Sequence, residues 1–94
     1  MLVHVVLMRF ADPSNAPEAA RRLLGLLGRV PEIRALEAGL DVTRSEVSYD
    51  LVLTTRHADA EELAAYQQHP EHQALGAWLR PLLVDRAVVD HLVP

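Results

Sequence analysis

The sequence contains no cysteine, which excludes both a disulfide framework and a thiolate metal site. It also contains no lysine, so all nine basic residues are arginine, and thirteen acidic residues bring the formal charge to −4. This charge argues against a nucleic-acid partner, whose phosphates require a basic surface. A phosphate-binding glycine loop, a Gly-x-Ser-x-Gly elbow and a dinucleotide fingerprint are missing too. We therefore expect no cofactor.

The apolar stretch at residues 2–10 lacks the features of a signal peptide or a membrane span. It has no basic leader and no small-residue cleavage site, and Arg9 interrupts it early. We therefore expect a cytoplasmic protein with no membrane partner. The composition shows no break along the 94 residues, which favours a single domain over residues 1–94.

The hydrophobic pattern predicts four strands, which are expected at residues 2–10, 33–43, 47–56 and 83–93. Gly39 suggests a bulge in the second strand, and residues 44–47 suit a four-residue hairpin. A helix is expected from Pro17 to Gly28.

A second helical region follows Asp59, which stands three residues before Glu62 in capping-box spacing. Pro70 cannot continue an unbroken helix, so we expect a kink there and a new helix that begins with His69 near its cap. Pro81 should end this second piece.

The order β-α-β-β-α-β predicts an α+β, ferredoxin-like fold: a four-stranded antiparallel sheet in spatial order 4-1-3-2 with both helices on one face. Side chains of the first strand alternate between the two faces of the sheet. Both sets are largely apolar: His4, Val6, Met8 and Phe10 on one face, and Val3, Val5, Leu7 and Arg9 on the other. A sheet with one solvated face should alternate more cleanly. We therefore expect the face opposite the helices to pair with a second copy of the chain as a homodimer. The alternative is a monomer with an exposed apolar patch.

Four segments form a distinctive pattern: the opening strand with His4, the stretch Tyr66-Gln67-Gln68-His69-Pro70-Glu71-His72, the helix with Trp78, and the last strand with Asp90. Together they resemble the stress-responsive α/β-barrel (Dabb) family over essentially the whole chain. The resemblance implies a dimer whose two sheets form a central barrel. It does not imply one activity.

A plant member of that family, olivetolic acid cyclase, closes a polyketide chain by aldol chemistry. The resemblance implies that His4, Tyr66 and His72 line a pocket and that Tyr66 and His72 carry any catalysis. This chain differs from the cyclase at Leu51, where the cyclase has another pocket histidine, and at Arg86, where it has an apolar wall.

His4 and Asp90 should lie side by side, because the first and last strands are expected to be adjacent and antiparallel. A carboxylate beside an imidazole fixes its tautomer and favours its use as a general base. The alternative is a buried structural pair that holds the end of the barrel together.

Tyr66 and His72 flank the expected kink. The positive end of the new helix should lower the pKa of His72 and favour its neutral form. Neutral His72 could then remove a proton from a carbon acid while Tyr66 stabilises the enolate oxygen. The alternative is that both residues serve as capping and core groups.

The remaining histidines are expected to have other places. His69 and His72 have a spacing that a metal could use, but no nearby carboxylate completes a site, so we expect no metal. His57 should face water beside Asp59. His91 should alternate away from Asp90 and lie at the dimer side.

The sequence therefore favours a homodimer with a small pocket between helices and sheet that binds an apolar or carbonyl ligand. Any chemistry would be cofactor-independent acid–base chemistry by Tyr66 and His72, assisted by His4 and Asp90. Two alternatives remain: a non-enzymatic, stress-associated structural dimer, and a cofactor-free monooxygenase or isomerase. A cavity of a few hundred Å³ would favour ligand chemistry, and solid packing would favour the structural role.

Overall fold

The computed structural model describes residues 1–94 and shows the predicted succession of elements. The strands are β1 (Leu2–Phe10), β2 (Ala35–Leu40), β3 (Leu51–His57) and β4 (Leu83–Leu92). The helices are α1 (Ala16–Leu24), α2 (Ala60–Gln68) and α3 (Pro70–Leu79), with short 3₁₀ turns at Pro13–Asn15 and Arg80–Leu82.

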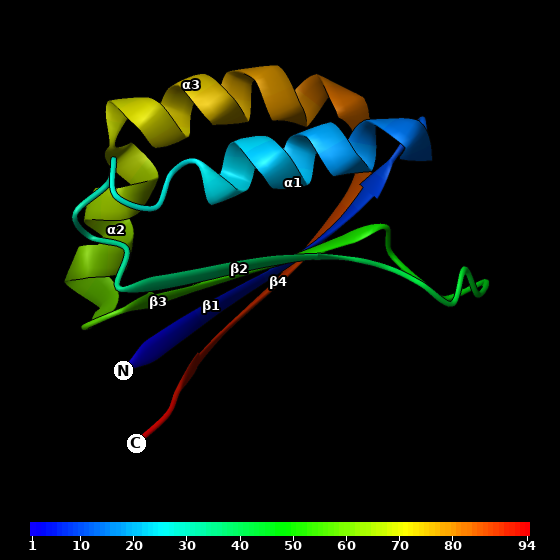
Figure 1. Ribbon diagram of the computed structural model, residues 1–94. Helices are drawn as coiled ribbons and strands as arrows, with labels where there is room; N and C mark the ends of the chain where they lie inside the picture. The colour runs from blue at the N-terminus through cyan, green and yellow to red at the C-terminus, as the bar shows by residue number, and fades with distance from the viewer.

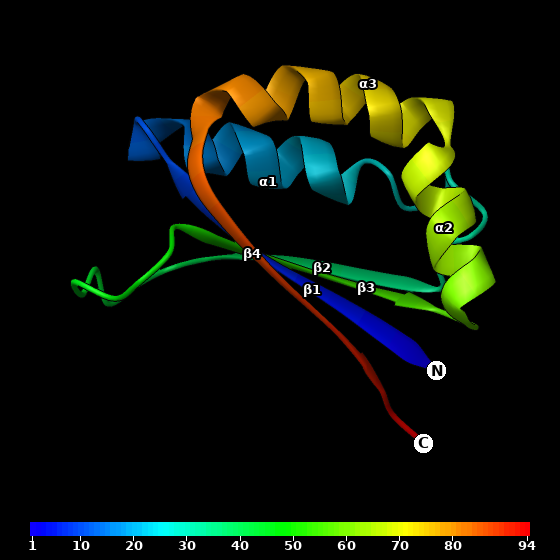
Figure 2. The ribbon, with the colours of Figure 1, turned by 180° about the vertical axis from the view of Figure 1, so that it is seen from behind.

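The strands form one antiparallel sheet in the order β2-β3-β1-β4, which is the predicted 4-1-3-2 order. Helices α1 and α3 run side by side over one face of the sheet, and α2 stands at one end (Figures 1 and 2). The other face carries no helix. The predicted α+β, ferredoxin-like architecture is confirmed.

The connection between β2 and β3 is longer than the predicted four-residue hairpin and extends from Asp41 to Asp50. Asp41 accepts the backbone N–H of Arg44 at 2.7 Å, and Asp50 accepts the Arg44 guanidinium at 2.9 Å. These side-chain bonds replace ladder bonds, which explains why both strands are shorter here than predicted.

The predicted bulge near Gly39 is wrong, because β2 and β3 pair without interruption. The irregularity lies instead between Arg9 and Phe10, where the register of β1 against β4 shifts. Here Phe10 donates its N–H to the side chain of Asp50 at 2.8 Å. The sequence pattern contained no glycine to mark this position.

The helix ends follow the predicted capping signals. Gly28 has a φ of 87°, a left-handed conformation that glycine adopts without a Cβ penalty, and it closes the turn after α1. Asp59 accepts the N–H of Glu62 at 2.9 Å at the start of α2. His69 accepts the N–H of Glu71 at 3.1 Å at the start of α3, and Pro70 occupies the first turn. The predicted kink is confirmed.

The core lies between the sheet and the helices, where Val6, Met8 and Leu53 pack with Leu23 of α1. Because side chains alternate along a strand, the same inner face also carries His4 and Asp90, which pairs with it on β4. The fold thus directs several polar groups of β1 and β4 toward α3.

The outer face of the sheet is apolar but only partly covered. Val5 and Leu7 are half-buried, while Val52 is 37% and Val89 is 61% exposed. Val3 is already buried within the single chain. None of the helices has both the length and the apolar character that a membrane span requires.

Candidate functional site

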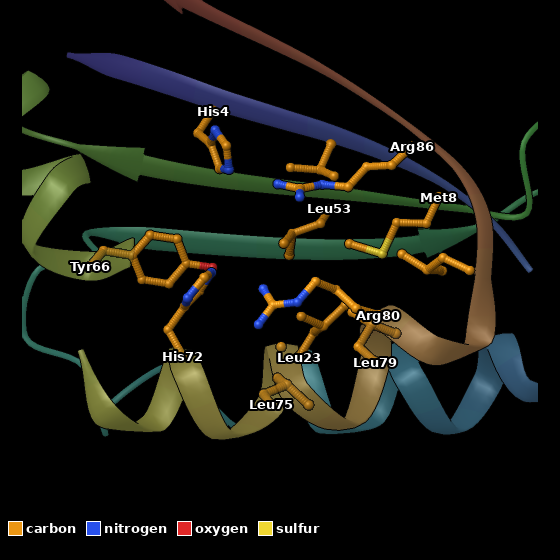
Figure 3. Close-up of a pocket in the computed structure, with 13 residues that line it drawn as sticks. His4, Met8, Leu23, Leu53, Tyr66, His72, Leu75, Leu79, Arg80 and Arg86 are labelled. Atoms are coloured by element: carbon orange, nitrogen blue, oxygen red, sulfur yellow. The ribbon is translucent and has the colours of Figure 1, made fainter. Parts of the chain in front are cut away.

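A cavity of about 50 Å³ lies between the inner face of the sheet and α3 (Figure 3). Its polar lining comes from β1, α2, α3, the following 3₁₀ turn and β4, and comprises His4, Tyr66, His72, Arg80 and Arg86. Its apolar lining comprises Val6, Met8, Leu23, Leu53, Leu75, Leu79 and Leu83, and Gly76 completes the wall. Three of the four residues predicted to carry chemistry therefore border one cavity.

The cavity is smaller than the few hundred Å³ expected for a ligand site. It is nevertheless an open space, lined by Leu75 but by neither Trp78 nor Phe10. The side chains of Arg80 and Arg86 extend into the space between the sheet and α3, which reduces the open volume (Figure 3). The result is a small pocket with mainly apolar walls and five polar side chains.

His4 and Asp90 form the contact predicted from the strand pairing. They are opposite each other in the β1–β4 ladder, and Nδ1 of His4 lies 2.5 Å from Oδ1 of Asp90. His4 is buried, whereas the Asp90 side chain is 40% exposed. Because an ionised carboxylate only accepts hydrogen bonds, Nδ1 of His4 carries the proton and Nε2 is left free.

Three histidine rings lie near the ring of Tyr66. Its ring centroid lies 4.6 Å from that of His72, 5.0 Å from that of His57 and 6.4 Å from that of His4. Burial raises the pKa of Tyr66 to about 12, and the nearby charge of Arg86 opposes that rise. The phenol is therefore protonated at neutral pH and can donate a hydrogen bond.

His72 is half-buried in the first turn of α3, and it meets Tyr66 edge to face. Its pKa is lowered, as predicted, but the main cause is burial rather than the helix start. The positive charges of Arg80 and Arg86 act in the same direction, while the backbone carbonyl of Gln67 opposes them. Neutral imidazole is therefore the favoured form at this position.

The prediction that His57 faces water is wrong, because the residue is fully buried. Its Nδ1 donates to the backbone carbonyl of Glu32 at 2.6 Å, and its Nε2 accepts from the Thr55 hydroxyl at 2.8 Å. This arrangement stacks the imidazole against Tyr66. Strand alternation places His57 on the same face as Thr55, and this signal was present in the sequence.

His69 and His91 lie outside the cavity. His69 caps α3, and His91 pairs with Val3 and so lies on the outer face of the sheet, away from Asp90. The structure contains no group of three or more His, Cys, Asp or Glu side chains that could hold a metal ion.

Arg80 and Arg86 line the cavity but were not among the predicted site residues. Arg86 has the same parity along β4 as Asp90, so strand alternation alone places it on the inner face. Arg80 lies in the 3₁₀ turn after α3, where sequence periodicity gives no direction.

An antiparallel sheet with helices on one face and a histidine–tyrosine cavity between the layers defines a ferredoxin-like α+β protein with a candidate acid–base site. The chain belongs to the Stress responsive A/B Barrel Domain family, whose family model matches residues 2–93. The resemblance noted from the sequence is thereby confirmed.

Relatives of this chain match it over most of their length. An uncharacterised protein of Streptomyces coelicolor is 30% identical over 81 residues, which is 79% of this chain and 81% of the relative. A dimeric ferredoxin-like protein of unknown function from Thermobifida fusca is 27% identical, with a TM-score of 0.85 over 98% of this chain and 90% of that one. A hydroxynitrile lyase from Passiflora edulis is 11% identical, with a TM-score of 0.83 over 99% and 93% of the two chains.

Proposed function

We propose that the chain forms a homodimer whose cavity performs cofactor-independent acid–base chemistry on a small carbonyl compound. One observation carries this proposal: a half-buried histidine whose pKa is lowered and a tyrosine whose pKa is raised to about 12 meet at an open cavity, at a centroid distance of 4.6 Å. Groups with such opposite shifts supply a base and a hydrogen-bond donor at the same pH.

The proposed step is removal of a proton from the carbon next to the carbonyl. The C–H bond breaks, the proton moves to the neutral imidazole of His72, and the electron pair moves onto the carbonyl oxygen. The protonated hydroxyl of Tyr66 stabilises that oxygen by donating a hydrogen bond. In the structure this hydroxyl makes no hydrogen bond within the chain, and Figure 3 shows it directed toward His72 and the cavity.

His4 is proposed to assist from the opposite wall. Asp90 holds Nδ1, so the free Nε2 can accept a proton or a hydrogen bond from the ligand. The solved hydroxynitrile lyase supports the proposal only at the level of the fold, since it shows that this architecture can host a lyase.

The homodimer is proposed to form through the outer face of the sheet. A surface depression of about 260 Å³ that reaches that side is lined mainly by apolar side chains, among them Leu7 and Val52 of the outer face. The Thermobifida relative is dimeric, and exposed apolar patches of this kind commonly mark contacts between chains. Light scattering behind a sizing column should report twice the chain mass of 10.4 kDa.

Hydrogen–deuterium exchange at carbon tests the proposed chemistry directly. Pyruvate and butanone are incubated with the protein in D₂O, and the loss of the methyl or methylene proton signal is followed by NMR. We expect exchange above the rate without protein, and loss of that excess in His72→Ala and Tyr66→Phe. Gln68→Ala is the control, because Gln68 is exposed at the end of α2 and lies outside the cavity. Exchange of neither compound, with the protein folded, would contradict the proposal.

The other predictions from the sequence remain predictions. A purely structural dimer would show no exchange in any variant, and a cofactor-free monooxygenase would consume dioxygen, which an oxygen electrode measures. A single domain over residues 1–94, a cytoplasmic location and a role in the stress response likewise rest on the sequence.

A further inference from the structure

Two guanidinium groups border the cavity without a carboxylate partner. Neither Arg80 nor Arg86 forms an ion pair or a side-chain hydrogen bond within the chain, although both line the pocket. Most other arginines are paired: Arg9 with Asp85, Arg21 and Arg22 with Glu18, Arg34 with Glu62, and Arg44 with Asp41 and Asp50. Arg29 and Arg56 also lack such a partner, but they lie outside this cavity.

The two arginines converge on the reactive end of the cavity. Arg80 approaches from the turn after α3 and Arg86 from β4, and both guanidinium groups extend toward the side where Tyr66 and His72 lie (Figure 3). Their positive charge reaches those residues, because both arginines lower the pKa of His72 and Arg86 opposes the rise for Tyr66.

Gly76 makes room for one of these side chains. A Cβ atom at this position would lie 3.0 Å from Nη1 and 3.3 Å from Cζ of Arg80, closer than most real Cβ contacts. The glycine therefore lets the guanidinium of Arg80 lie against α3 beside the cavity. Both arginine residues are exposed, which places their charges at the open side where a ligand enters.

We propose that the carbonyl compound bound beside Tyr66 and His72 carries a carboxylate group, which Arg80 and Arg86 recognise. This inference rests on the proposed function and names its substrate class, a short keto acid. Planar guanidinium groups match carboxylates through paired hydrogen bonds, and the ligand supplies the negative charge that the chain does not.

The size and lining of the cavity fit a short acid. A volume of about 50 Å³ holds roughly four water-sized groups, so a compact ligand occupies it with its charged end at the open side. The apolar walls formed by Val6, Leu53 and Leu79 suit a short hydrocarbon portion. A carboxylate held by the arginines directs the carbonyl end toward Tyr66, and the same positive charges stabilise an enolate.

Binding of pyruvate and pyruvamide tests the charge requirement, since these two compounds have nearly the same shape and differ in charge. The dissociation constants are measured by NMR titration of the labelled protein. We expect pyruvate to bind about tenfold more tightly or better, and this preference to be lost in Arg80→Gln and Arg86→Gln. Arg29→Gln is the matched control and keeps the preference. Urea unfolding confirms that each variant is folded.

Equal binding of the acid and the amide by the unmodified protein would overturn the inference, as would an acid preference that survives both arginine substitutions. Inorganic phosphate is the third probe. Phosphate that competes as well as pyruvate would assign the arginines to a phosphate group instead and overturn the carboxylate assignment.

Failure of this inference is distinguishable from failure of the proposed function. Arginine-dependent binding of pyruvate without carbon exchange would reject the chemistry and keep the anion site. Exchange of butanone and pyruvamide as fast as that of pyruvate, with no effect of the arginine substitutions, would reject the anion site and keep the chemistry.

Discussion

Two histidines contact the ring of Tyr66 from different sides, and their surroundings differ. His57 stacks on the ring, is fully buried, and uses both ring nitrogens in hydrogen bonds within the chain. His72 meets the ring edge, is half-buried, and borders the cavity. One residue thus has both ring nitrogens satisfied by the fold, while the other lies on the wall of the cavity.

The comparison shows that a lowered pKa does not by itself mark a functional histidine. Burial is the main cause of the lowered pKa at both positions. The two residues differ in whether a ligand could reach a ring nitrogen. Both nitrogens of His57 are used in hydrogen bonds within the chain, whereas His72 lies on the cavity wall. We therefore assign His57 to the structure and His72 to the proposed chemistry, and this assignment can be tested.

Replacement of His72 should have the largest effect, and it should fall on activity. In His72→Ala we expect carbon exchange to fall by roughly 10² to 10⁴, the usual contribution of a general base. Stability should change by less than about 1 kcal/mol, because the side chain is only half-buried. Exchange rates and urea unfolding of the same sample provide the two readouts. Unchanged exchange would remove His72 from the chemistry.

Replacement of His57 should instead destabilise the fold. His57→Ala leaves a cavity against Tyr66 and removes the partners of Thr55 and of the Glu32 carbonyl. We expect a loss of about 2–4 kcal/mol in the free energy of unfolding. Urea unfolding at pH 7.5 measures it, with Gln68→Ala at an exposed position of α2 as the control. A variant as stable as the original would show that these hydrogen bonds contribute little.

Acidification should destabilise the protein through the same two histidines. Their folded-state pKa values are lowered from 6.5, so below that pH the unfolded chain binds more protons than the folded chain. The stability that neutral His57 and His72 contribute is fully present above about pH 6.5. It is lost as the pH falls toward their folded-state pKa values. The urea midpoint between pH 7.5 and 5 should therefore decline, less steeply in His57→Gln. An identical decline in that variant would contradict this account.

Replacement of Asp90 should have the smallest effect. The carboxylate orients His4 through one contact at 2.5 Å, but its side chain is 40% exposed, so water weakens the interaction. In Asp90→Asn we expect carbon exchange to fall on the order of fivefold. A loss as large as that of His72→Ala would make the His4–Asp90 pair the main base instead.

Most of the fold was predictable from local signals. The apolar run of β1, the capping residue Asp59 and the break at Pro70 each specify structure through nearby residues, and each prediction was confirmed. The long connection between β2 and β3 was not, because it depends on where the side chains of Asp41 and Asp50 find donors.

The site was predictable to a lesser degree. Strand pairing brought His4 and Asp90 together as expected, since register follows from topology. His57 was misplaced because its neighbour in sequence, Asp59, suggested a surface turn, whereas its partners are Thr55 and the distant carbonyl of Glu32. The direction of Arg80 likewise depends on the space left by Gly76, which only the folded chain reveals.

Side-chain ¹⁵N NMR of the histidines, recorded from pH 8 to pH 5 with and without pyruvate, tests the central comparison most directly. We predict that His57 and His72 both become protonated only below pH 6.5, and that pyruvate shifts the nitrogen signals of His72 but leaves those of His57 unchanged. Protonation of His72 at or above pH 6.5, or an equal response of both residues to pyruvate, would contradict the account.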